Sequence, residues 1–215
     1  MTKAMRWRII VLQVVALLLL VGGSFGAFYG STFATDQIKQ QLQQEQIVFP
    51  KDQASGLLPG LEQYAGQQVL NGDQAHAYAD KFIWVHMQSA GQDNGAFHPY
   101  SYWSGKARTD AATLAAAQKD PTTTPDKLAQ LQAQVAKDNA TVDTLFKGDT
   151  LRAMLNQAWT MSVFAQIAYY AGFGLAAAAL IVFGTLVFEA IEAVRGMENV
   201  VVVPASRVRE PAGVN

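Results

Sequence analysis

Two long apolar stretches, one near each end of the chain, constrain its fold more than any other feature. The first covers residues 9–30 and the second covers residues 161–188, and neither contains a charged residue. A helix needs roughly 20 apolar residues to cross a bilayer core about 30 Å thick. In lipid such a segment has to be helical, because a helix satisfies its own backbone hydrogen bonds. The sequence therefore predicts an all-α membrane protein with two transmembrane helices.

The two stretches divide the chain into five segments. We expect a cytoplasmic N-terminus over 1–8, a first transmembrane helix over 9–30, an extracytoplasmic helical domain over 31–157, a second transmembrane helix over 158–190 and a cytoplasmic tail over 191–215. Because a single loop joins the spans, the two helices would form an antiparallel hairpin that flanks this domain. The loop is long enough for one small domain and too short for two.

The distribution of charge predicts the orientation in the membrane. Basic residues lie just outside both apolar stretches, namely Lys3, Arg6, Arg8, Arg195, Arg207 and Arg209. The loop between the stretches carries ten Lys and Arg residues against thirteen Asp and Glu residues. Cytoplasmic flanks of membrane helices are enriched in Lys and Arg. We therefore expect a plasma-membrane protein with both termini in the cytoplasm and residues 31–157 outside.

The first apolar stretch also has the basic start and apolar core of a signal peptide. The nearest cleavage site, around Thr32, Phe33 and Ala34, matches the small-x-small pattern poorly. We therefore expect this stretch to be retained as a membrane helix.

Small residues recur every four positions in both stretches. The first contains Gly22, Gly26 and Gly30, and the second contains Ala168, Gly172 and Ala176. Small residues on one helical face let another backbone approach closely in lipid. The two sets would lie at the same depth in an antiparallel hairpin, so we expect them to pack on each other. The alternative is that one or both face a partner protein.

The loop has the pattern of several helices and shows no strand-like alternation. Residues 35–46 extend the first helix, and further helical stretches are predicted at 61–70, at 74–89 with Asp73 as N-cap, and at 125–146. Gly148 is predicted to end the last of these, and Asp149 to cap a new helix that leads into the second apolar stretch.

Residues 91–105 have no helical period and an unusual density of aromatic side chains: Phe97, Tyr100, Tyr102 and Trp103. Tyrosine and tryptophan are enriched at the centres of protein interfaces. Three roles are compatible with the pattern. The segment could dock on a neighbouring subunit, insert at the outer lipid surface or fill the core of its own domain.

The three histidines are the only obvious metal ligands or proton carriers. His76 lies three residues from Asp73 and four from Asp80, so the three could share one helical face and hold a metal ion. The simpler interpretation is a capping aspartate, a solvated aspartate and a surface histidine. We expect His86 to pack beside its aromatic neighbours, and we assign no role to His98.

No pattern in the chain indicates catalysis or a cofactor. The chain has no cysteine, which excludes disulfides, thiolate catalysis and iron–sulfur clusters. It has no glycine pattern for nucleotides and no basic aromatic strip for nucleic acid. Gln13 and Gln166 are the polar residues that we expect to face protein inside the membrane. We predict no enzyme activity, no cofactor and no nucleic-acid partner.

The tail contains four consecutive β-branched residues, Val200, Val201, Val202 and Val203. Such a run in a polar tail favours burial. It could add a strand to the edge of a partner's sheet, or it could lie along the membrane surface.

Three short runs carry a resemblance: LEQYA at 61–65, NGDQAHAYA at 71–79 and LRA at 151–153. Together with the layout of the chain, they resemble uncharacterised two-pass membrane proteins of high-GC Gram-positive bacteria. The resemblance implies a bacterial plasma membrane and a helical external domain, and it brings no catalytic residues with it.

These features predict a non-enzymatic accessory, structural or assembly subunit of a larger bacterial membrane complex, for example a respiratory one. Its partners would be other integral membrane subunits and the lipid bilayer. The alternative is an extracytoplasmic sensor module that binds a ligand or a lipid, which predicts a closed apolar pocket in the loop domain. A third hypothesis, a metal-dependent enzyme, would rest on His76. The sequence leaves any small-molecule ligand and the oligomeric state open.

Overall fold

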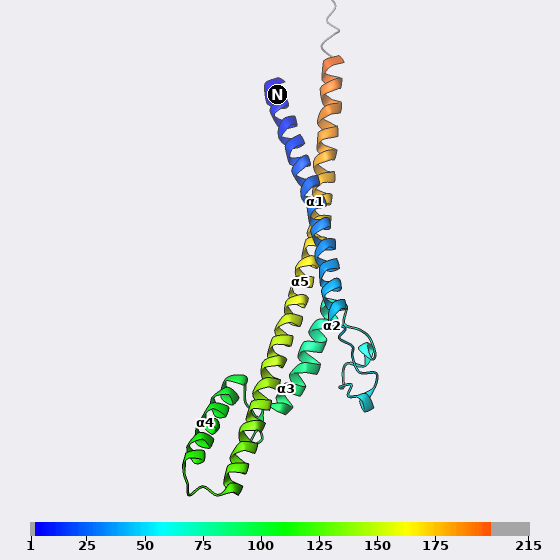
Figure 1. The fold of residues 1–215 in the computed structure, drawn as a ribbon. Helices are drawn as coiled ribbons and strands as arrows, with labels where there is room; N and C mark the ends of the chain where they lie inside the picture. Colours follow the sequence, from blue (N-terminus) through cyan, green and yellow to red (C-terminus); the bar gives the residue numbers. More distant parts are fainter. Residues whose placement is uncertain (1–2, 199–215) are drawn as a thin grey trace, which may run out of the picture. The chain divides into compact units, whose positions relative to one another are not determined.

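The computed structural model describes residues 3–198, and these residues are mostly helical (Figure 1). In chain order the elements are α1 (Lys3–Glu45), η1 (Gln53–Ser55), η2 (Glu62–Tyr64), α2 (Gly72–Ala77), η3 (Tyr78–Ile83), α3 (Trp84–Ala90), β1 (Gln92–Asp93), β2 (Ala96–Phe97), α4 (Tyr100–Lys119) and α5 (Pro125–Glu198). The predicted docking segment at residues 200–203 lies outside the described residues. The chain divides into two compact units: an apolar unit, formed by residues up to Gly30 and from Ala168 onward, and a middle unit, Ser31–Ile167.

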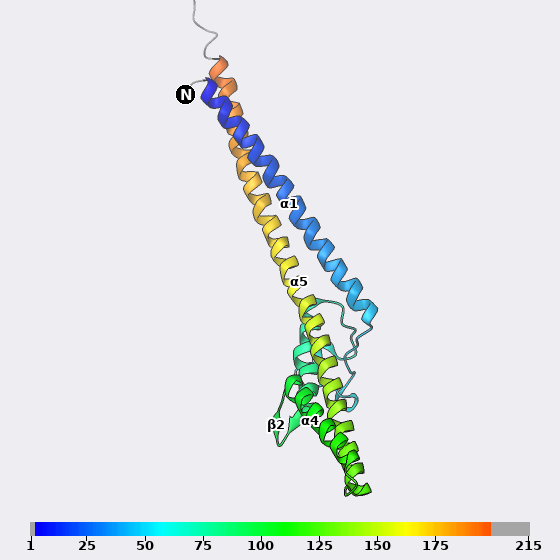
Figure 2. The ribbon, with the colours of Figure 1, turned by 60° about the vertical axis from the view of Figure 1, so that its left-hand side comes forward.

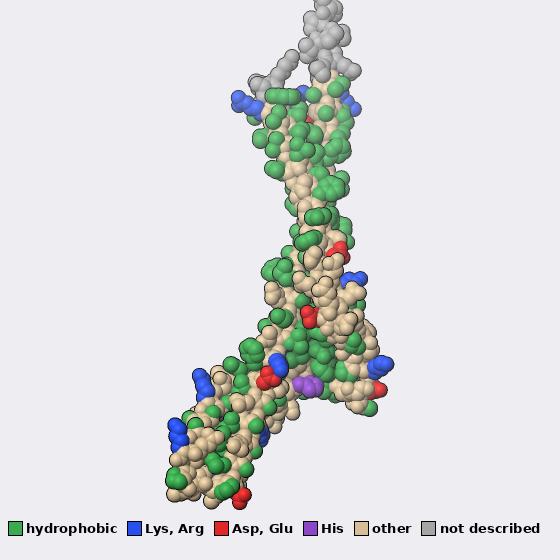
Figure 3. All heavy atoms as spheres, in the orientation of Figure 1, with side chains coloured by type: hydrophobic (Ala, Val, Ile, Leu, Met, Phe, Trp, Pro, Cys, Tyr) green, Lys and Arg blue, Asp and Glu red, His purple; other side chains and the backbone are tan. Residues whose placement is uncertain are grey.

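Helices α1 and α5 are both long and apolar enough to cross a membrane, as the sequence predicts. In the apolar unit their large side chains point outward, and Leu19 and Leu180 each expose 71% of their surface. Figure 3 shows hydrophobic side chains over these helices, with Lys and Arg side chains at one end. A continuous apolar surface of this kind is rare on proteins that are surrounded by water.

The two helices of the apolar unit contact each other through a small set of side chains. Ser24 donates a hydrogen bond from Oγ to the carbonyl oxygen of Gly172, at 2.9 Å. Phe28 packs edge-on against Tyr169 and Phe173, with ring centroids 5.6 and 5.0 Å apart. Further along, the Gln13 side chain lies 3.5 Å from the Thr185 hydroxyl. Residues later in α1 contact residues earlier in α5, so the two helices run antiparallel.

The glycine pattern behaves differently from the expectation that the two sets of small residues pack on each other. A Cβ atom built on Gly22, Gly26 or Gly30 would meet no atom of the described chain within 4 Å. The contact instead uses the opposite face of α1, which carries the Ser24 hydroxyl and the Phe28 ring. On the other helix, Gly172 does lie in the contact, where an added Cβ would come within 2.9 Å of the Phe28 ring.

The middle unit has one hydrophobic core. Its buried members come from the end of α1, the 46–71 segment, the α2–α3 region, α4 and α5, and include Leu42, Phe49, Leu61, Val69, Ala75, Ala79, Met87, Trp103, Leu145 and Leu155. The 46–71 segment is held by backbone hydrogen bonds, including Val69 N to Ile47 O at 2.8 Å and Phe49 N to Gln67 O at 2.9 Å. The helix predicted at 61–70 is therefore wrong apart from the short η2 turn, because residues 66–69 pair with residues 47–50 instead.

Helices α2 and α3 are joined without a break by η3, which is a π-helical segment. The N-cap of α2 is Asn71, whose side chain accepts a hydrogen bond from the backbone of Gln74 at 2.9 Å. This corrects the prediction that Asp73 caps the helix. Asp73 lies inside the first turn, where its charge suits the positive end of the helix.

A tight hairpin and a helix replace the loop predicted at 91–105. Strands β1 and β2 pair antiparallel around Asn94 and Gly95, which have φ values of 50° and 80°. Asn-Gly is the preferred sequence for such a turn. Helix α4 then begins directly after Pro99. Figure 2 shows the hairpin beside α4, and the Tyr102 hydroxyl donates to Asp93 at 2.8 Å.

Helix α5 continues through Gly148, so the predicted helix end at Gly148 and the predicted cap at Asp149 are both wrong. A Cβ on Gly148 would come within 2.6 Å of the Cγ and Sδ atoms of Met87. The glycine therefore allows α3 to approach α5 closely, which is a different use of a small residue from ending a helix.

Candidate functional site

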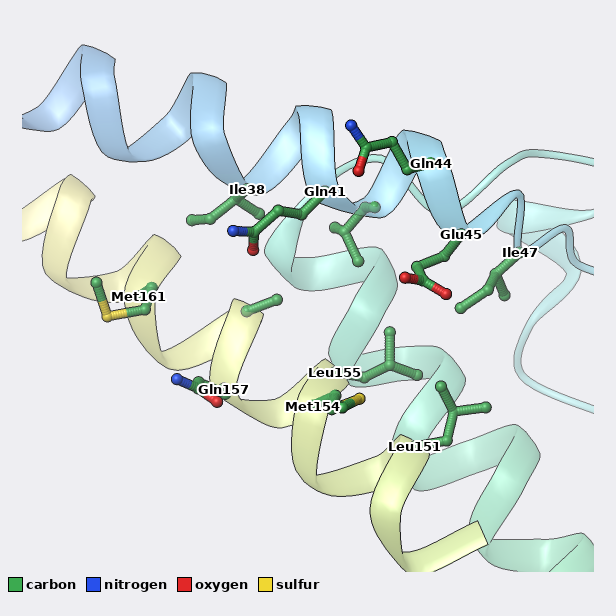
Figure 4. Close-up of a pocket in the computed structure, with 12 residues that line it drawn as sticks. Ile38, Gln41, Gln44, Glu45, Ile47, Leu151, Met154, Leu155, Gln157 and Met161 are labelled. Carbon is green, nitrogen blue, oxygen red and sulfur yellow. The ribbon is translucent and has the colours of Figure 1, made fainter. Parts of the chain in front are cut away.

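An apolar groove of about 330 Å³ lies in the middle unit, between the last turns of α1 and the facing turns of α5 (Figure 4). Its lining residues are Ile38, Gln41, Leu42, Gln44, Glu45 and Ile47 on one side, and Leu151, Met154, Leu155, Gln157, Ala158 and Met161 on the other. The volume is at the lower end of the range for small-molecule sites.

The spacing of apolar residues on the two helices produces the groove. Ile38 and Leu42 are four residues apart on α1, and Leu151 and Leu155 are four apart on α5, so each pair lies on one helical face. Leu42 and Leu155 are buried, and both line the groove. Met154 is more exposed, at 64%, and lies at the rim. Methionine is flexible and polarisable, so a rim of this kind adapts to the shape of an occupant.

One charged side chain points into this apolar space. Glu45 is the last residue of α1, and its carboxylate is directed toward the space between the helices (Figure 4). It forms no ion pair with the side chains that the structure describes, residues 5–195, and the last turn of α1 contains no basic residue. The other polar groups that line the groove are the side-chain amides of Gln41, Gln44 and Gln157.

A polar cluster ties the π-helical segment to α5. Arg152 pairs with Asp80 at 2.9 Å through Nη2 and donates from Nε to the Ala79 carbonyl at 3.2 Å. Its guanidinium also lies 4.5 Å from the centre of the Trp84 ring, in a cation–π arrangement. These contacts fix the rotation of α5 relative to the α2–α3 region, and with it the direction in which the groove residues of α5 face.

Burial opposes ionisation of Asp80, but hydrogen bonds from Arg152 and Asn156, together with the nearby charges, outweigh it and lower the pKa of Asp80. His76 lies in the same cluster, with Nδ1 3.0 Å from Oδ1 of Asn156 and 3.5 Å from Asp80. Its ring stacks on Trp159 with centroids 4.3 Å apart. The part of the chain that the structure describes contains no group of three or more His, Asp or Glu side chains placed to hold a metal ion.

A second group of charges is buried between α4 and α5. Asp138 is fully buried, and Lys106 lies 3.1 Å from it and 2.7 Å from Asp110. Burial raises the pKa of Asp138, and the hydrogen bond with Asp110 adds to the effect. The hydrogen bond to Asp110 raises the pKa of Lys106. Gln134 donates a further hydrogen bond to Asp138 at 2.8 Å. The group holds the two helices together in a fixed register.

The four aromatic residues that the sequence singles out have different environments. Trp103 is buried in the core, where its indole N–H donates to the Gly91 carbonyl at 3.0 Å. Phe97 packs edge-on against Trp84 and is partly buried. Tyr100 and Tyr102 remain more than a third exposed, at 38% and 39%. Of the three roles that the sequence allows for this segment, filling the core of its own domain fits Trp103 and Phe97. The two tyrosines lie on the surface.

The other two histidines also pack against aromatic rings. His86 lies against Phe82, with ring centroids 4.4 Å apart, as predicted, and its Nδ1 atom is 2.7 Å from the Phe82 carbonyl oxygen. His98 stacks on Tyr102 at 4.0 Å.

Sequence reasoning missed the groove and the partner of Asp80. The sequence does not show that the end of α1 lies opposite the apolar residues Leu151, Leu155 and Ala158 of α5. The spacing of Lys106 and Asp110, four apart on a helix, was the one signal for the buried charges.

No family model, curated protein or solved structure matches the chain. The described residues form a mostly helical protein with two helices that are long and apolar enough to cross a membrane.

Proposed function

We propose that this chain is a two-pass plasma-membrane protein and a non-enzymatic accessory or assembly subunit of a larger bacterial membrane complex. In this proposal both termini are cytoplasmic and residues 31–157 lie outside, where they form the external helical domain. The basic flanks of the two apolar stretches support this orientation. The resemblance to two-pass proteins of high-GC Gram-positive bacteria belongs to the same proposal.

The observation that carries the proposal is the open glycine face of α1. Gly26 and Ser24 are two residues apart, which is about 200° of rotation around a helix with 3.6 residues per turn. The face with Gly22, Gly26 and Gly30 therefore points away from the face that contacts α5. A glycine costs about 1 kcal/mol relative to alanine in a helix interior. Three glycines on a face that the described chain leaves uncovered are well suited to a close contact with a helix of another subunit.

Mild detergent extraction of the native membrane followed by native mass analysis tests this proposal. We expect the chain to be recovered in a complex with at least one other integral membrane protein. Recovery only as a monomer or a homodimer would contradict the proposal.

A pair of matched variants tests the glycine face directly. Gly26→Leu places a bulky side chain on the open face and is expected to reduce recovery of the complex by at least tenfold. Gly184→Leu makes the same change at a glycine of α5 that also has no atom of the described residues within 4 Å, and it should leave recovery unchanged. Equal loss in both variants would mean that membrane insertion, and not a specific contact, had been damaged.

The groove favours a second candidate function, an external module that binds a ligand. The two functions are compatible, because the groove lies in the middle unit and the glycine face lies in the apolar unit.

A further inference from the structure

We propose that the groove between the end of α1 and α5 binds a single-chain amphiphile whose apolar chain ends in a protonated amine. This inference deepens the second candidate function and rests on it, and it does not depend on assembly of the chain into a complex. It commits to one class of ligand because the shape and the charge of the groove each restrict the choice.

The walls of the groove require an apolar occupant. Leucine, isoleucine, alanine and methionine side chains line most of its surface, and burial of methylene groups against such walls is favourable by about 0.8 kcal/mol each. The polar groups besides Glu45 are the amides of Gln41, Gln44 and Gln157. In Figure 4, Gln44 points away from the groove.

Glu45 favours an occupant with a positive charge, because among the described residues it is the one charged residue that lines the groove and its side chain is exposed. An apolar chain that covers the groove removes water from the Glu45 carboxylate, which is costly unless the chain brings a cation to pair with it. The carboxylate also lies at the C-terminus of α1, where the helix dipole is negative, so both features attract the same sign of charge.

The basic side chains on the facing part of α5 form ion pairs with residues outside the groove. Lys147 pairs with Asp143 at 2.7 Å, and Arg152 pairs with Asp80 at 2.9 Å. Neither lines the groove. Because no Lys or Arg of the described chain lines the groove, we expect the ligand to supply the cation.

The size of the groove indicates a single chain and excludes a phospholipid. A volume of about 330 Å³ is small for two long acyl chains with their glycerol. In a phospholipid the phosphate also lies between the acyl chains and the amine, so it would approach Glu45 first and be repelled. An alkylammonium ion has no such group, and its amine is protonated at neutral pH because primary amines titrate near pH 10.

The test uses the full chain in nanodiscs of phosphatidylcholine, with methyl NMR of its methionines as the readout. The probes are octylammonium, octanesulfonate and octanol, which share one chain and differ in the charge of the head. Empty nanodiscs give the fraction of each probe that dissolves in the bilayer. We expect octylammonium to shift the methyl signals of Met154 and Met161, and to bind at least tenfold more tightly than octanesulfonate.

Three variants separate the charge of Glu45 from general effects. Glu45→Gln should weaken binding of octylammonium at least tenfold, and Glu45→Lys should reverse the preference in favour of octanesulfonate. Asp36→Asn removes the same charge from an exposed position of the same helix that does not line the groove, and it should change nothing. Urea unfolding of each variant, followed by tryptophan fluorescence, confirms that the fold is kept.

Two results would overturn the inference. The first is equal affinity for octylammonium and octanesulfonate, or equal affinity of the wild type and Glu45→Gln for octylammonium. The second is loss of octylammonium binding in nanodiscs that contain phosphatidylethanolamine, because a bilayer lipid would then be the occupant. Neither result bears on recovery of the membrane complex, so failure here is distinguishable from failure of the accessory-subunit proposal.

Discussion

The close approach of α2 to α5 at Gly72 gives the sharpest prediction on stability. Gly72 is the first residue of α2, and a Cβ built on it would collide with the Ser162 hydroxyl, approach the Ser162 Cβ to 2.5 Å and the Trp159 Cα to 3.2 Å. Carbon atoms pack best at about 3.5–4.0 Å. The Ser162 hydroxyl is held in place by donating to the Trp159 carbonyl at 2.7 Å. The wall that faces Gly72 is therefore rigid.

Gly72→Ala is expected to destabilise the middle unit by about 2–3 kcal/mol, the upper part of the range of about 1–3 kcal/mol found when a methyl group is forced into a packed core. Two other glycines serve as matched controls. Gly105 lies inside α4 with open space around it, so Gly105→Ala should stabilise the unit by about 0.5–1 kcal/mol through helix propensity alone. At Gly148 the neighbour is the flexible Met87 side chain, so Gly148→Ala should cost about 1 kcal/mol.

Urea unfolding of the full chain in nanodiscs measures these differences. Tryptophan fluorescence is a suitable probe, because Trp84, Trp103 and Trp159 all lie in the middle unit. The double variant Gly72→Ala with Ser162→Gly should lose less stability than the sum of the losses in the two single variants. We expect a difference of at least about 1 kcal/mol, because Ser162→Gly removes part of the obstacle. Equal stability of Gly72→Ala and Gly105→Ala would refute the close contact.

Two further predictions concern the charged groups of the middle unit. Lys106→Met leaves the fully buried Asp138 without its cation and should lower the free energy of unfolding by about 2–4 kcal/mol, measured in urea. The double variant Lys106→Met with Asp138→Leu should regain most of this lost stability. An equal loss in the double variant would contradict the prediction. The lowered pKa of Asp80 means that its pairing stabilises the fold above the unfolded pKa of about 3.9 and is lost as the pH falls through the folded value. Because Asp80 is partly exposed, Asp80→Asn should lower the free energy of unfolding by only about 1 kcal/mol at pH 7. This difference from the wild type should shrink below about pH 4. A difference independent of pH would show that the charge of Asp80 is not responsible.

The sequence predicts the helical class and the two membrane-length helices because both depend on local composition. It also predicts the extension of α1 beyond the first stretch, since Ile38 and Leu42 are spaced for one helical face. The errors arise where tertiary contacts override local signals. Gly148 is a helix-ending residue by pattern, but its lack of a side chain is used for the contact with Met87.

The start of α4 shows a different limit. The Asn94-Gly95 pair was a usable turn signal, but the dense aromatic residues after it obscured the helix. Trp103 and Ala107, four residues apart, are the buried positions that give α4 its inner face. The groove could not be predicted at all, because it depends on which part of α5 the end of α1 meets, and that pairing has no mark in the sequence.

The central claim is that two helices cross the membrane and place residues 31–157 outside. The chain has no cysteine, so single cysteines can report the side of the membrane through reaction with an impermeant maleimide. We predict that Gln63→Cys reacts in intact cells and that Met5→Cys reacts only after the cells are permeabilised. Reaction of Met5→Cys in intact cells, or protection of Gln63→Cys until permeabilisation, would contradict the account.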